Sequence, residues 1–247
     1  MLKLIKGYAG SGKTRNLIEN VYSLLNNGAA NPYQILILTL TPSEKEELIK
    51  LNDDNSKHLN IWSVDELYKY ILKKSPSHLE SETLSDALAI NIIGAICKSE
   101  FIQNTALNSL TKSNSFFREL YNLFGLFKNN EINYEDLTEI IDKTDITDTD
   151  KIRLRLIASV FKRYNEILKR FNYLDYRDAV LSAIKALEEN TILLNTIKSR
   201  FSHIFIDGFE DITYLQFKLI KLIANPDNLH IYGDEYSRIQ DEVIPKN

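Results

Sequence analysis

The segment GYAGSGKT at residues 7–14 has the residue types and spacing of a loop that binds phosphate. Glycines let the backbone turn so that successive N–H groups point at phosphate oxygens. Lys13 supplies a mobile charge for the β- and γ-phosphates of a nucleotide, and Thr14 offers a hydroxyl to Mg²⁺. A glycine-rich turn that binds nothing is the alternative, but every position of the pattern is matched. The predicted ATP contacts are Gly7, Gly10, Ser11, Gly12, Lys13, Thr14 and Arg15.

A second candidate stands at the end of a short apolar run, HIFID at 203–207. A carboxylate at the end of a parallel strand can share a magnesium ion with the hydroxyl of a phosphate loop. Asp207 is therefore predicted to bind Mg²⁺ together with Thr14. The alternative is that Asp207 is the N-cap of the helix downstream.

The residue after Asp207 is Gly208, where P-loop ATPases often have a glutamate that orients and deprotonates the attacking water. Glu210 is a candidate for that role, two residues away, and its alternative is a solvated loop carboxylate. Asp211 is expected to cap the following helix. Lys13, Asp207 and Glu210 are thus the candidate catalytic residues.

Strands and helices alternate at both ends of the chain. This alternation can bring the phosphate loop and Asp207 together at the ends of neighbouring strands. Ser43 with Glu46, and Ser63 with Glu66, form two capping-box patterns after apolar runs. Strands that are each followed by a helix predict an α/β fold with a parallel sheet. The predicted strands are 2–5, 35–41, 59–62, 203–207 and 229–232.

The middle of the chain has helical periodicity throughout, with a polar link at 144–150. We therefore expect a discontinuous α/β domain formed by 1–75 and 196–247, interrupted by a helical insertion at 76–195.

Composition limits the possible functions. The net charge is −4 over 247 residues, so any DNA contact must come from a local basic surface. One cysteine, Cys97, excludes an internal disulfide framework and fits a cytoplasmic protein. The sequence has neither a signal peptide nor an apolar run long enough to span a membrane, so no membrane partner is expected.

In their order and spacing, six segments resemble the superfamily 1 DNA helicases of the UvrD type. Only the phosphate loop is specific by itself. The segments are GYAGSGKT (7–14), ILILTLTPSEKEEL (35–48), SVDELYKYIL (63–72), LDYRDAV (174–180), HIFIDGFEDITYLQFKLIKLI (203–223) and NLHIYGDEYSRIQ (228–240).

This resemblance implies a RecA-like fold, binding of ATP and Mg²⁺, and contact with single-stranded DNA in repair or recombination. The family also uses a second RecA-like half, which we expect to lie outside these 247 residues or on a partner helicase or nuclease subunit. The chain departs from the family pattern at Gly208 and at Glu210, where the family has glutamate and glutamine. Ser237 stands where a phosphate-sensing glutamine is usual, with Gln240 three residues on.

Three features resemble AddB, a helicase-like nuclease subunit of bacterial recombination complexes. They are the early phosphate loop, Asp-Gly-Phe at 207–209 and the proline Pro42; the pair Gly233-Asp234 is more similar to UvrD. The sequence therefore predicts an ATP-binding motor half with slow hydrolysis, or a non-motor AddB-like subunit whose nucleotide stabilises a fold or an interface. A small-molecule kinase is a third class, disfavoured by the order of the segments.

Candidate DNA contacts are of two kinds. The first follows the second and third strands, where Trp62 is either a base-stacking or, preferably, a core residue. The second is a basic stripe on the helix predicted at 151–171, for which a solvated face is the favoured alternative. Asp234 and Arg238 are weaker candidates for nucleotide contacts. The residues of the two surfaces are Thr39, Thr41, Trp62 and Ser63, and Lys151, Arg155, Lys162 and Lys169.

Overall fold

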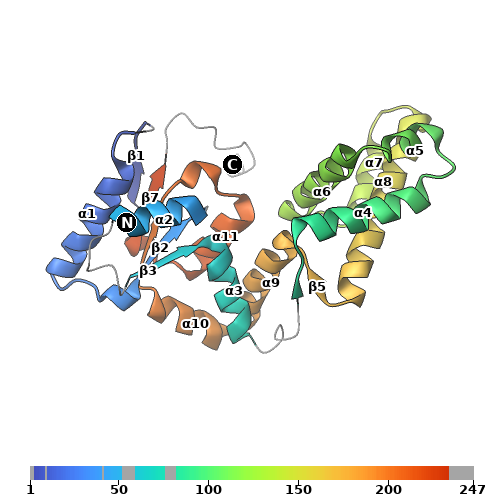
Figure 1. Cartoon of the computed structure of the whole chain (residues 1–247). Helices are drawn as coiled ribbons and strands as arrows, with labels where there is room; N and C mark the ends of the chain where they lie inside the picture. Colours follow the sequence, from blue (N-terminus) through green and yellow to red (C-terminus); the bar gives the residue numbers. More distant parts are fainter. Residues whose placement is uncertain (1–2, 9, 41, 52–58, 76–81, 234–247) are drawn as a thin grey trace. The chain divides into compact units, whose positions relative to one another are not determined.

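The computed structural model describes residues 3–8, 10–40, 42–51, 59–75 and 82–233. The chain divides into two compact units (Figure 1). The sheet unit comprises 1–79 and 180–247, and the helical unit comprises 80–179. Our expectation from the sequence carried the insertion to 195, whereas α10 (Thr191–Arg200) packs against α11 (Tyr214–Ile223) within the sheet unit.

The sheet unit contains a five-stranded parallel sheet in the order β1-β7-β6-β2-β3, which confirms the predicted α/β class. Every residue of β2 and β7 is buried, as in parallel strands whose two faces are both covered. Leu17 and Val21 of the first helix pack on one face, against Phe205 and Tyr232. The strands are β1 (Lys3–Lys6), β2 (Ile35–Thr39), β3 (Asn60–Ser63), β6 (His203–Ile206) and β7 (Leu229–Gly233).

Helices and short turns connect these strands. Besides α10 and α11, they are α1 (Lys13–Asn26), α2 (Pro42–Leu51), α3 (Val64–Lys74) and the three 3₁₀ turns η1 (Pro32–Gln34), η4 (Phe209–Asp211) and η5 (Pro226–Asn228). The helix α9 (Tyr176–Glu189) begins in the helical unit and continues into the sheet unit.

Local capping explains where several helices begin. The predicted capping box of Ser63 and Glu66 is confirmed at the start of α3. The one at Ser43 is wrong, because α2 begins one residue earlier, at Pro42, a residue type that suits the first turn of a helix. The prediction that Asp211 caps the following helix is wrong. Thr213 caps α11, and Asp211 lies in the turn η4.

The helical unit encloses its own apolar core, built largely from leucine, isoleucine and aromatic side chains. A short parallel pair of strands, β4 (Glu82–Thr83) and β5 (Tyr173–Leu174), was not predicted from the sequence. Among the described residues, no helix is both long and apolar enough to span a bilayer. The helices are α4 (Asp86–Glu100), α5 (Thr105–Leu110), α6 (Asn114–Asn129), α7 (Tyr134–Lys143) and α8 (Asp148–Arg170).

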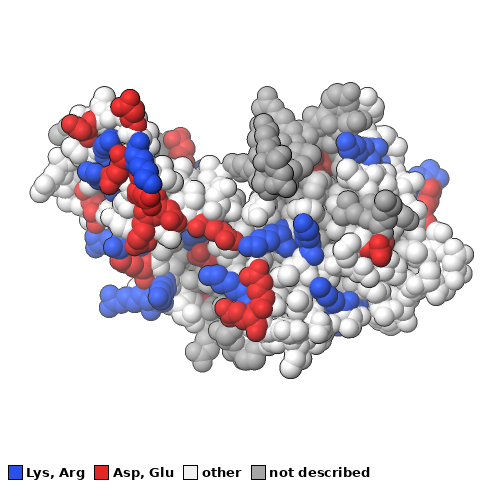
Figure 2. All heavy atoms as spheres, turned by 180° about the vertical axis from the view of Figure 1, so that it is seen from behind, with Lys and Arg blue, Asp and Glu red and all other residues white. Residues whose placement is uncertain are grey.

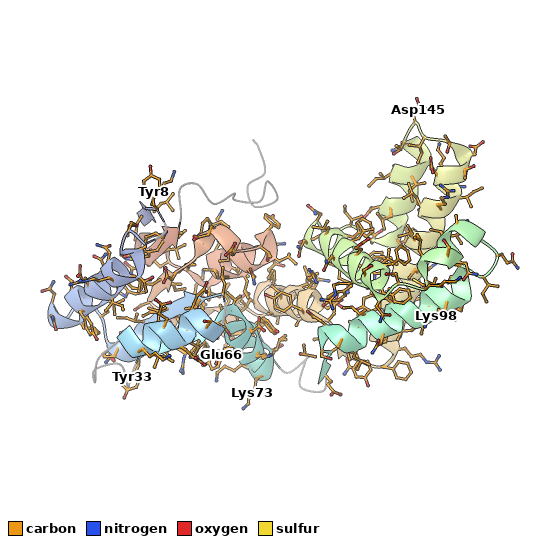
Figure 3. All side chains as sticks on the ribbon, turned by 45° about the horizontal axis from the view of Figure 1, so that its top comes forward. Tyr8, Tyr33, Glu66, Lys73, Lys98 and Asp145 are labelled. Atoms are coloured by element: carbon orange, nitrogen blue, oxygen red, sulfur yellow. The ribbon has the colours of Figure 1, made fainter. Side chains whose placement is uncertain are left out.

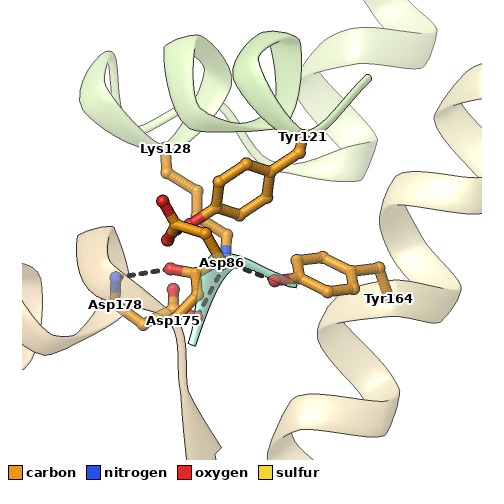
Figure 4. A network of polar contacts seen from close by, with 6 residues as sticks. All are labelled: Asp86, Tyr121, Lys128, Tyr164, Asp175 and Asp178. Carbon is orange, nitrogen blue, oxygen red and sulfur yellow. Dashed lines mark hydrogen bonds and ion pairs between the residues drawn. The ribbon is translucent and has the colours of Figure 1, made fainter. Parts of the chain in front are cut away.

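A buried ionic network joins α6, α8 and the start of α9 (Figure 4). The Lys128 ammonium lies 2.6 Å from Asp175 Oδ2 and 2.7 Å from Asp178 Oδ2. Asp175 also accepts a hydrogen bond from the Tyr164 hydroxyl at 3.0 Å, and Tyr121 donates to Asp86 at 2.7 Å. Lys128 thus pairs with both Asp175 and Asp178.

The two carboxylates beside Lys128 respond differently to burial. Burial opposes ionisation of Asp175, but the ammonium of Lys128 outweighs it and lowers the pKa of Asp175. Burial and the neighbouring Asp175 carboxylate raise the pKa of Asp178 to about 6, although Lys128 acts in the opposite direction. The site therefore holds one firmly ionised carboxylate and one that is easily protonated.

Candidate nucleotide-binding site

The phosphate loop lies at the edge of the sheet where the parallel strands end, which is the usual place for ligands in such folds. It connects β1 to α1, and the Gly7 N–H donates to the carbonyl oxygen of Gly233 at the end of β7 over 3.3 Å. The helix α1 begins at Lys13. Its N-terminal N–H groups and dipole therefore favour an anion at this loop.

Glycines shape the loop in two different ways. Gly10 and Gly12 have φ angles of 77° and 83°, in the left-handed region that favours glycine. Gly7 was expected to serve the same purpose, but its φ is not positive. A Cβ atom at position 7 would crowd the loop, because it would lie 2.4 Å from Ser11 Oγ, which would have to turn away, and 3.3 Å from Lys13 Cγ.

The lysine of the loop is folded over it. Lys13 Nζ donates to the carbonyl oxygen of Gly7 at 2.9 Å and to that of Tyr8 at 3.3 Å. The Tyr8 side chain is 61% exposed and projects outward from the loop (Figure 3). Arg15, which we predict to contact the nucleotide, pairs with Glu19 at 3.1 Å on the exposed face of α1.

Thr14 and Asp207 meet although 193 positions separate them. Thr14 Oγ1 donates to Asp207 Oδ2 at 2.8 Å. The backbone holds Asp207 in line with its strand, since its N–H donates to the carbonyl of Leu38 in β2 at 3.0 Å. The turn after it has Gly208 as its N-cap, so the N-cap alternative for Asp207 is not supported.

The chemistry of this pair fits magnesium. Mg²⁺ is typically held by one or two carboxylates together with phosphate oxygens and water, and a hydroxyl oxygen is also a hard ligand. Burial raises the pKa of Asp207 above its ordinary value; the carboxylates of Glu44 and Glu210 raise it further, and the hydrogen bond from Thr14 acts in the opposite direction. A divalent cation at this position would offset that excess of negative charge.

Gly208 has φ +75° and ψ 35°, a left-handed conformation. Space does not require a glycine at this position, since a Cβ atom would lie 3.6 Å from Glu44 Oε1 and 3.9 Å from Leu40 Cδ1. The backbone conformation itself therefore disfavours a glutamate at this position.

We expect Gly208→Ala to destabilise the sheet unit by about 1–2 kcal/mol, because an L-residue is strained in the left-handed region. Gly208→Asn should cost less, since asparagine tolerates that region better. Urea unfolding followed by the fluorescence of Trp62, the one tryptophan of the chain, measures both. Equal stability of wild type and Gly208→Ala would show that the turn relaxes without cost.

Two glutamates flank Asp207, one on each side of β6. Glu210 lies near the end of β7, because a Cβ atom at Gly233 would be 3.3 Å from Glu210 Oε2. Glu44 lies in the first turn of α2, after β2, and accepts a hydrogen bond from the Leu40 N–H at 3.0 Å. Sequence reasoning missed Glu44, although a carboxylate in the first turn after a parallel strand was an available signal.

Residues proposed to contact DNA after β2 and β3 are largely engaged within the protein. Thr39 is fully buried because strands pair with β2 on both sides, so that proposal is wrong for Thr39. The ring centroid of Trp62 lies 5.0 Å from that of Tyr70 and 5.2 Å from that of Phe201, which supports the interpretation of Trp62 as a core residue. Ser63 forms the cap of α3. The remaining candidates lie outside the described residues: Thr41, Asp234, Ser237, Arg238 and Gln240.

The predicted basic stripe faces α7. Arg155 pairs with Asp142 at 2.6 Å, and the Lys151 ammonium donates to the carbonyl of Asp142 at 3.2 Å. The Lys162 ammonium lies 4.6 Å from the centre of the Tyr134 ring, and Lys162 and Lys169 are both exposed. On the molecular face drawn in Figure 2, basic and acidic side chains of the described residues are interspersed.

Comparison with known proteins identifies relatives over nearly the whole chain. Residues 3–239 match the family described as UvrD/REP helicase N-terminal domain. ATP-dependent DNA helicase PcrA of Staphylococcus aureus is 26% identical over 236 residues, which are 94% of this chain and 31% of that protein. The PcrA of Staphylococcus epidermidis is also 26% identical, over 240 residues.

The chain spans about a third of the length of these curated relatives. The match to the family covers both the phosphate loop and the strand that ends at Asp207, the two segments that the fold brings together at the edge of the sheet. The chain therefore belongs to the UvrD/REP helicase family, to whose N-terminal domain it corresponds.

Proposed function

We propose that this chain is the ATP-binding motor half of a UvrD-type DNA helicase that acts on single-stranded DNA in repair or recombination. The observation that supports this most strongly is the 2.8 Å contact between Thr14 Oγ1 and Asp207 Oδ2. It joins the hydroxyl of the phosphate loop to the carboxylate that would share its magnesium ion. We further propose that the sheet unit forms the RecA-like domain, predicted at 1–75 with 196–247, and that the helical unit is its insertion, predicted at 76–195 but ending at 179 in the structure.

Each residue of the site then has a defined task. The N–H groups of the loop and of the start of α1 hold the phosphates of ATP. Lys13, which now donates to carbonyls of its own loop, would turn to the β- and γ-phosphates when ATP arrives. Thr14 and Asp207 would hold Mg²⁺, which neutralises charge on the phosphate oxygens. A second RecA-like half, or a partner helicase or nuclease subunit, would close over the nucleotide.

Hydrolysis by this chain is expected to be slow. The position after Asp207 carries no carboxylate, and its left-handed backbone would strain one. Positioned base catalysis typically contributes about 10²- to 10⁴-fold. The glycine in place of a carboxylate after Asp207 also favours the second candidate function, a non-motor AddB-like subunit in which bound ATP stabilises a fold or an interface.

Binding of single-stranded DNA separates the helicase proposal from an unrelated P-loop enzyme. We would titrate a fluorescein-labelled deoxythymidine oligonucleotide with the chain and measure anisotropy, with and without a non-hydrolysable ATP analogue and Mg²⁺. The helicase proposal expects binding whose affinity changes with nucleotide. Blunt duplex DNA of the same length is the control. Absence of binding in every arm would contradict the proposed DNA partner.

The same titration tests the basic stripe of α8. We expect the double variant Arg155→Gln and Lys162→Gln to leave the salt dependence of single-strand binding unchanged, because both side chains already contact α7. Two lost phosphate contacts would instead make the logarithmic salt slope shallower by about 1.4. A slope changed by that amount would place DNA on this helix.

A further inference from the structure

Two aspartates that share one lysine stand at the start of α9, in the segment LDYRDAV (174–180), to which the nucleotide site gives no role. We infer that Asp178 is a proton-sensitive latch of the helical unit. Protonation of its carboxylate tightens the hold of α6 and α8 on the start of α9, and ionisation loosens it. The latch lies within the helical unit and does not depend on nucleotide binding.

Asp175 joins three helices at this point (Figure 4). Its Oδ2 accepts hydrogen bonds from the Lys128 ammonium of α6 at 2.6 Å and from the Tyr164 hydroxyl of α8 at 3.0 Å. Its Oδ1 accepts from the Asp178 N–H at 2.9 Å, as the side chain of an N-cap residue does in the first turn of a helix. A change of charge beside Asp175 therefore acts on all three helices.

The negative charges of the pair outnumber the positive charge that they share. Lys128 Nζ lies 2.6 Å from Asp175 Oδ2 and 2.7 Å from Asp178 Oδ2, and the side chains of Lys128 and Asp175 are only 6% and 2% exposed. One ammonium balances one carboxylate, and burial leaves the second charge poorly solvated. A proton on Asp178 removes this excess, while the carbonyl oxygen of the neutral acid can still accept a hydrogen bond from Lys128.

The other polar groups that face the pair are engaged elsewhere. The Arg177 guanidinium lies 5.2 Å from the centre of the Tyr121 ring, and a Cβ atom at Gly125 would be 2.2 Å from its Nε. Among the described residues, Arg177 forms no ion pair. Tyr121 donates to Asp86 of α4 at 2.7 Å. Burial raises the pKa of the Tyr121 and Tyr164 hydroxyls, so both stay neutral near neutral pH.

The direction of the pH dependence follows from the two aspartates. Burial, and then the Asp175 carboxylate, raise the pKa of Asp178 from 3.8 to about 6, although Lys128 acts against them. Asp178 thus binds its proton more tightly in the folded unit, which gains stability as the pH falls through 6. Burial opposes ionisation of Asp175, but Lys128 lowers its pKa, so the contribution of Asp175 is lost only below 3.8.

The helical unit has few other groups that titrate in this range. Histidine is the side chain that ordinarily does so. All four histidines of the chain lie outside residues 80–179. Burial raises the pKa of Cys97, the one cysteine, to about 12. A gain in stability of this unit between pH 8 and pH 5 can therefore be traced to Asp178 by substitution.

Hydrogen exchange of the full chain, with each rate divided by the intrinsic rate at the same pH, tests the latch. From pH 8 to pH 5, we expect the protection of wild-type peptides from α6, α8 and the start of α9 to rise about tenfold. Asp178→Asn carries a neutral side chain of the same shape, so its protection should be the same at both pH values. Asp145→Asn, at an exposed aspartate of the same unit, is the matched control and should keep the wild-type pH dependence.

A carboxyl ¹³C titration of the wild-type chain by NMR is the second measurement, and it needs no variant to fold. The Asp178 resonance should titrate with a midpoint near pH 6. A midpoint below about pH 4.5, in the range of an ordinary aspartate, would overturn the inference. Wild-type protection that is unchanged or lower at pH 5, or a pH dependence that persists in Asp178→Asn, would overturn it as well.

Discussion

Lys128→Met is expected to destabilise the helical unit by about 3–5 kcal/mol, the cost of leaving buried carboxylates without their cation. The lysine is 6% exposed and serves both Asp175 and Asp178. Because the chain has two compact units, a single unfolding transition is not assumed. Hydrogen exchange of peptides from α6 and α8, followed with increasing urea, measures the loss in the helical unit directly.

Three further variants sharpen this experiment. Lys98→Met removes an exposed lysine of the same unit and should change stability by no more than about 0.5 kcal/mol. Asp178→Asn should be tolerated much better than Asp175→Asn. The pKa of Asp178 is already raised to about 6, whereas Asp175 accepts hydrogen bonds from Tyr164 and from the Asp178 N–H. Equal stability of Lys128→Met and Lys98→Met would show that the network contributes little.

Lys13→Ala is expected to weaken Mg-ATP binding by about a hundredfold, which corresponds to about 2–3 kcal/mol for a lost charge-assisted contact. Its ammonium donates to the carbonyl oxygens of Gly7 and Tyr8 in the loop. Those contacts are broken when the lysine turns to phosphate, so part of the gain from phosphate is offset. Competition with a fluorescent ATP analogue measures the affinity.

Lys6→Ala is the control for this variant, since Lys6 is an exposed lysine that directly precedes the loop. Its affinity for Mg-ATP should equal that of wild type. Matching affinities for wild type and Lys13→Ala would mean that the loop does not bind the terminal phosphates.

The phosphate loop could be predicted from the sequence because its chemistry is local. Residue types at fixed spacing determine where the N–H groups, the ammonium and the hydroxyl lie. Asp207 was also predictable, because an apolar run with a terminal carboxylate indicates where a strand ends. The reason for Gly7 was not, since the 2.4 Å approach of Ser11 Oγ depends on how the loop closes upon itself.

Glu44 was missed for a different physical reason. Its place beside Gly208 follows from the pairing of β2 with β6, which are separated by more than 160 residues of chain. Periodicity within a segment carries no information on which strands become neighbours. The β4–β5 pair escaped prediction similarly, because two-residue strands have no measurable alternation.

The capping predictions were also correct where local sequence decides the structure and wrong where a neighbouring residue or turn overrides it. Ser63 with Glu66 was correct because both partners lie within one turn, and the box forms although Lys45 also pairs with Glu66. At Ser43 the same pattern was overridden by Pro42, which suits the first helical position. Thr213 with Gln216, and not Asp211, caps α11, because the turn η4 places Asp211 before the start of the helix.

If Thr14 and Asp207 share a magnesium ion beside a nucleotide held by the phosphate loop, nucleotide affinity must depend on Mg²⁺ through Asp207. Isothermal titration of the chain with a non-hydrolysable ATP analogue, in Mg²⁺ and then in a chelator, measures this dependence. We expect one nucleotide to bind per chain, with an affinity that weakens by about tenfold or more without Mg²⁺ and that loses this dependence in Asp207→Ala. Absent binding, or an affinity that is the same with and without Mg²⁺ in the wild-type chain, would contradict it.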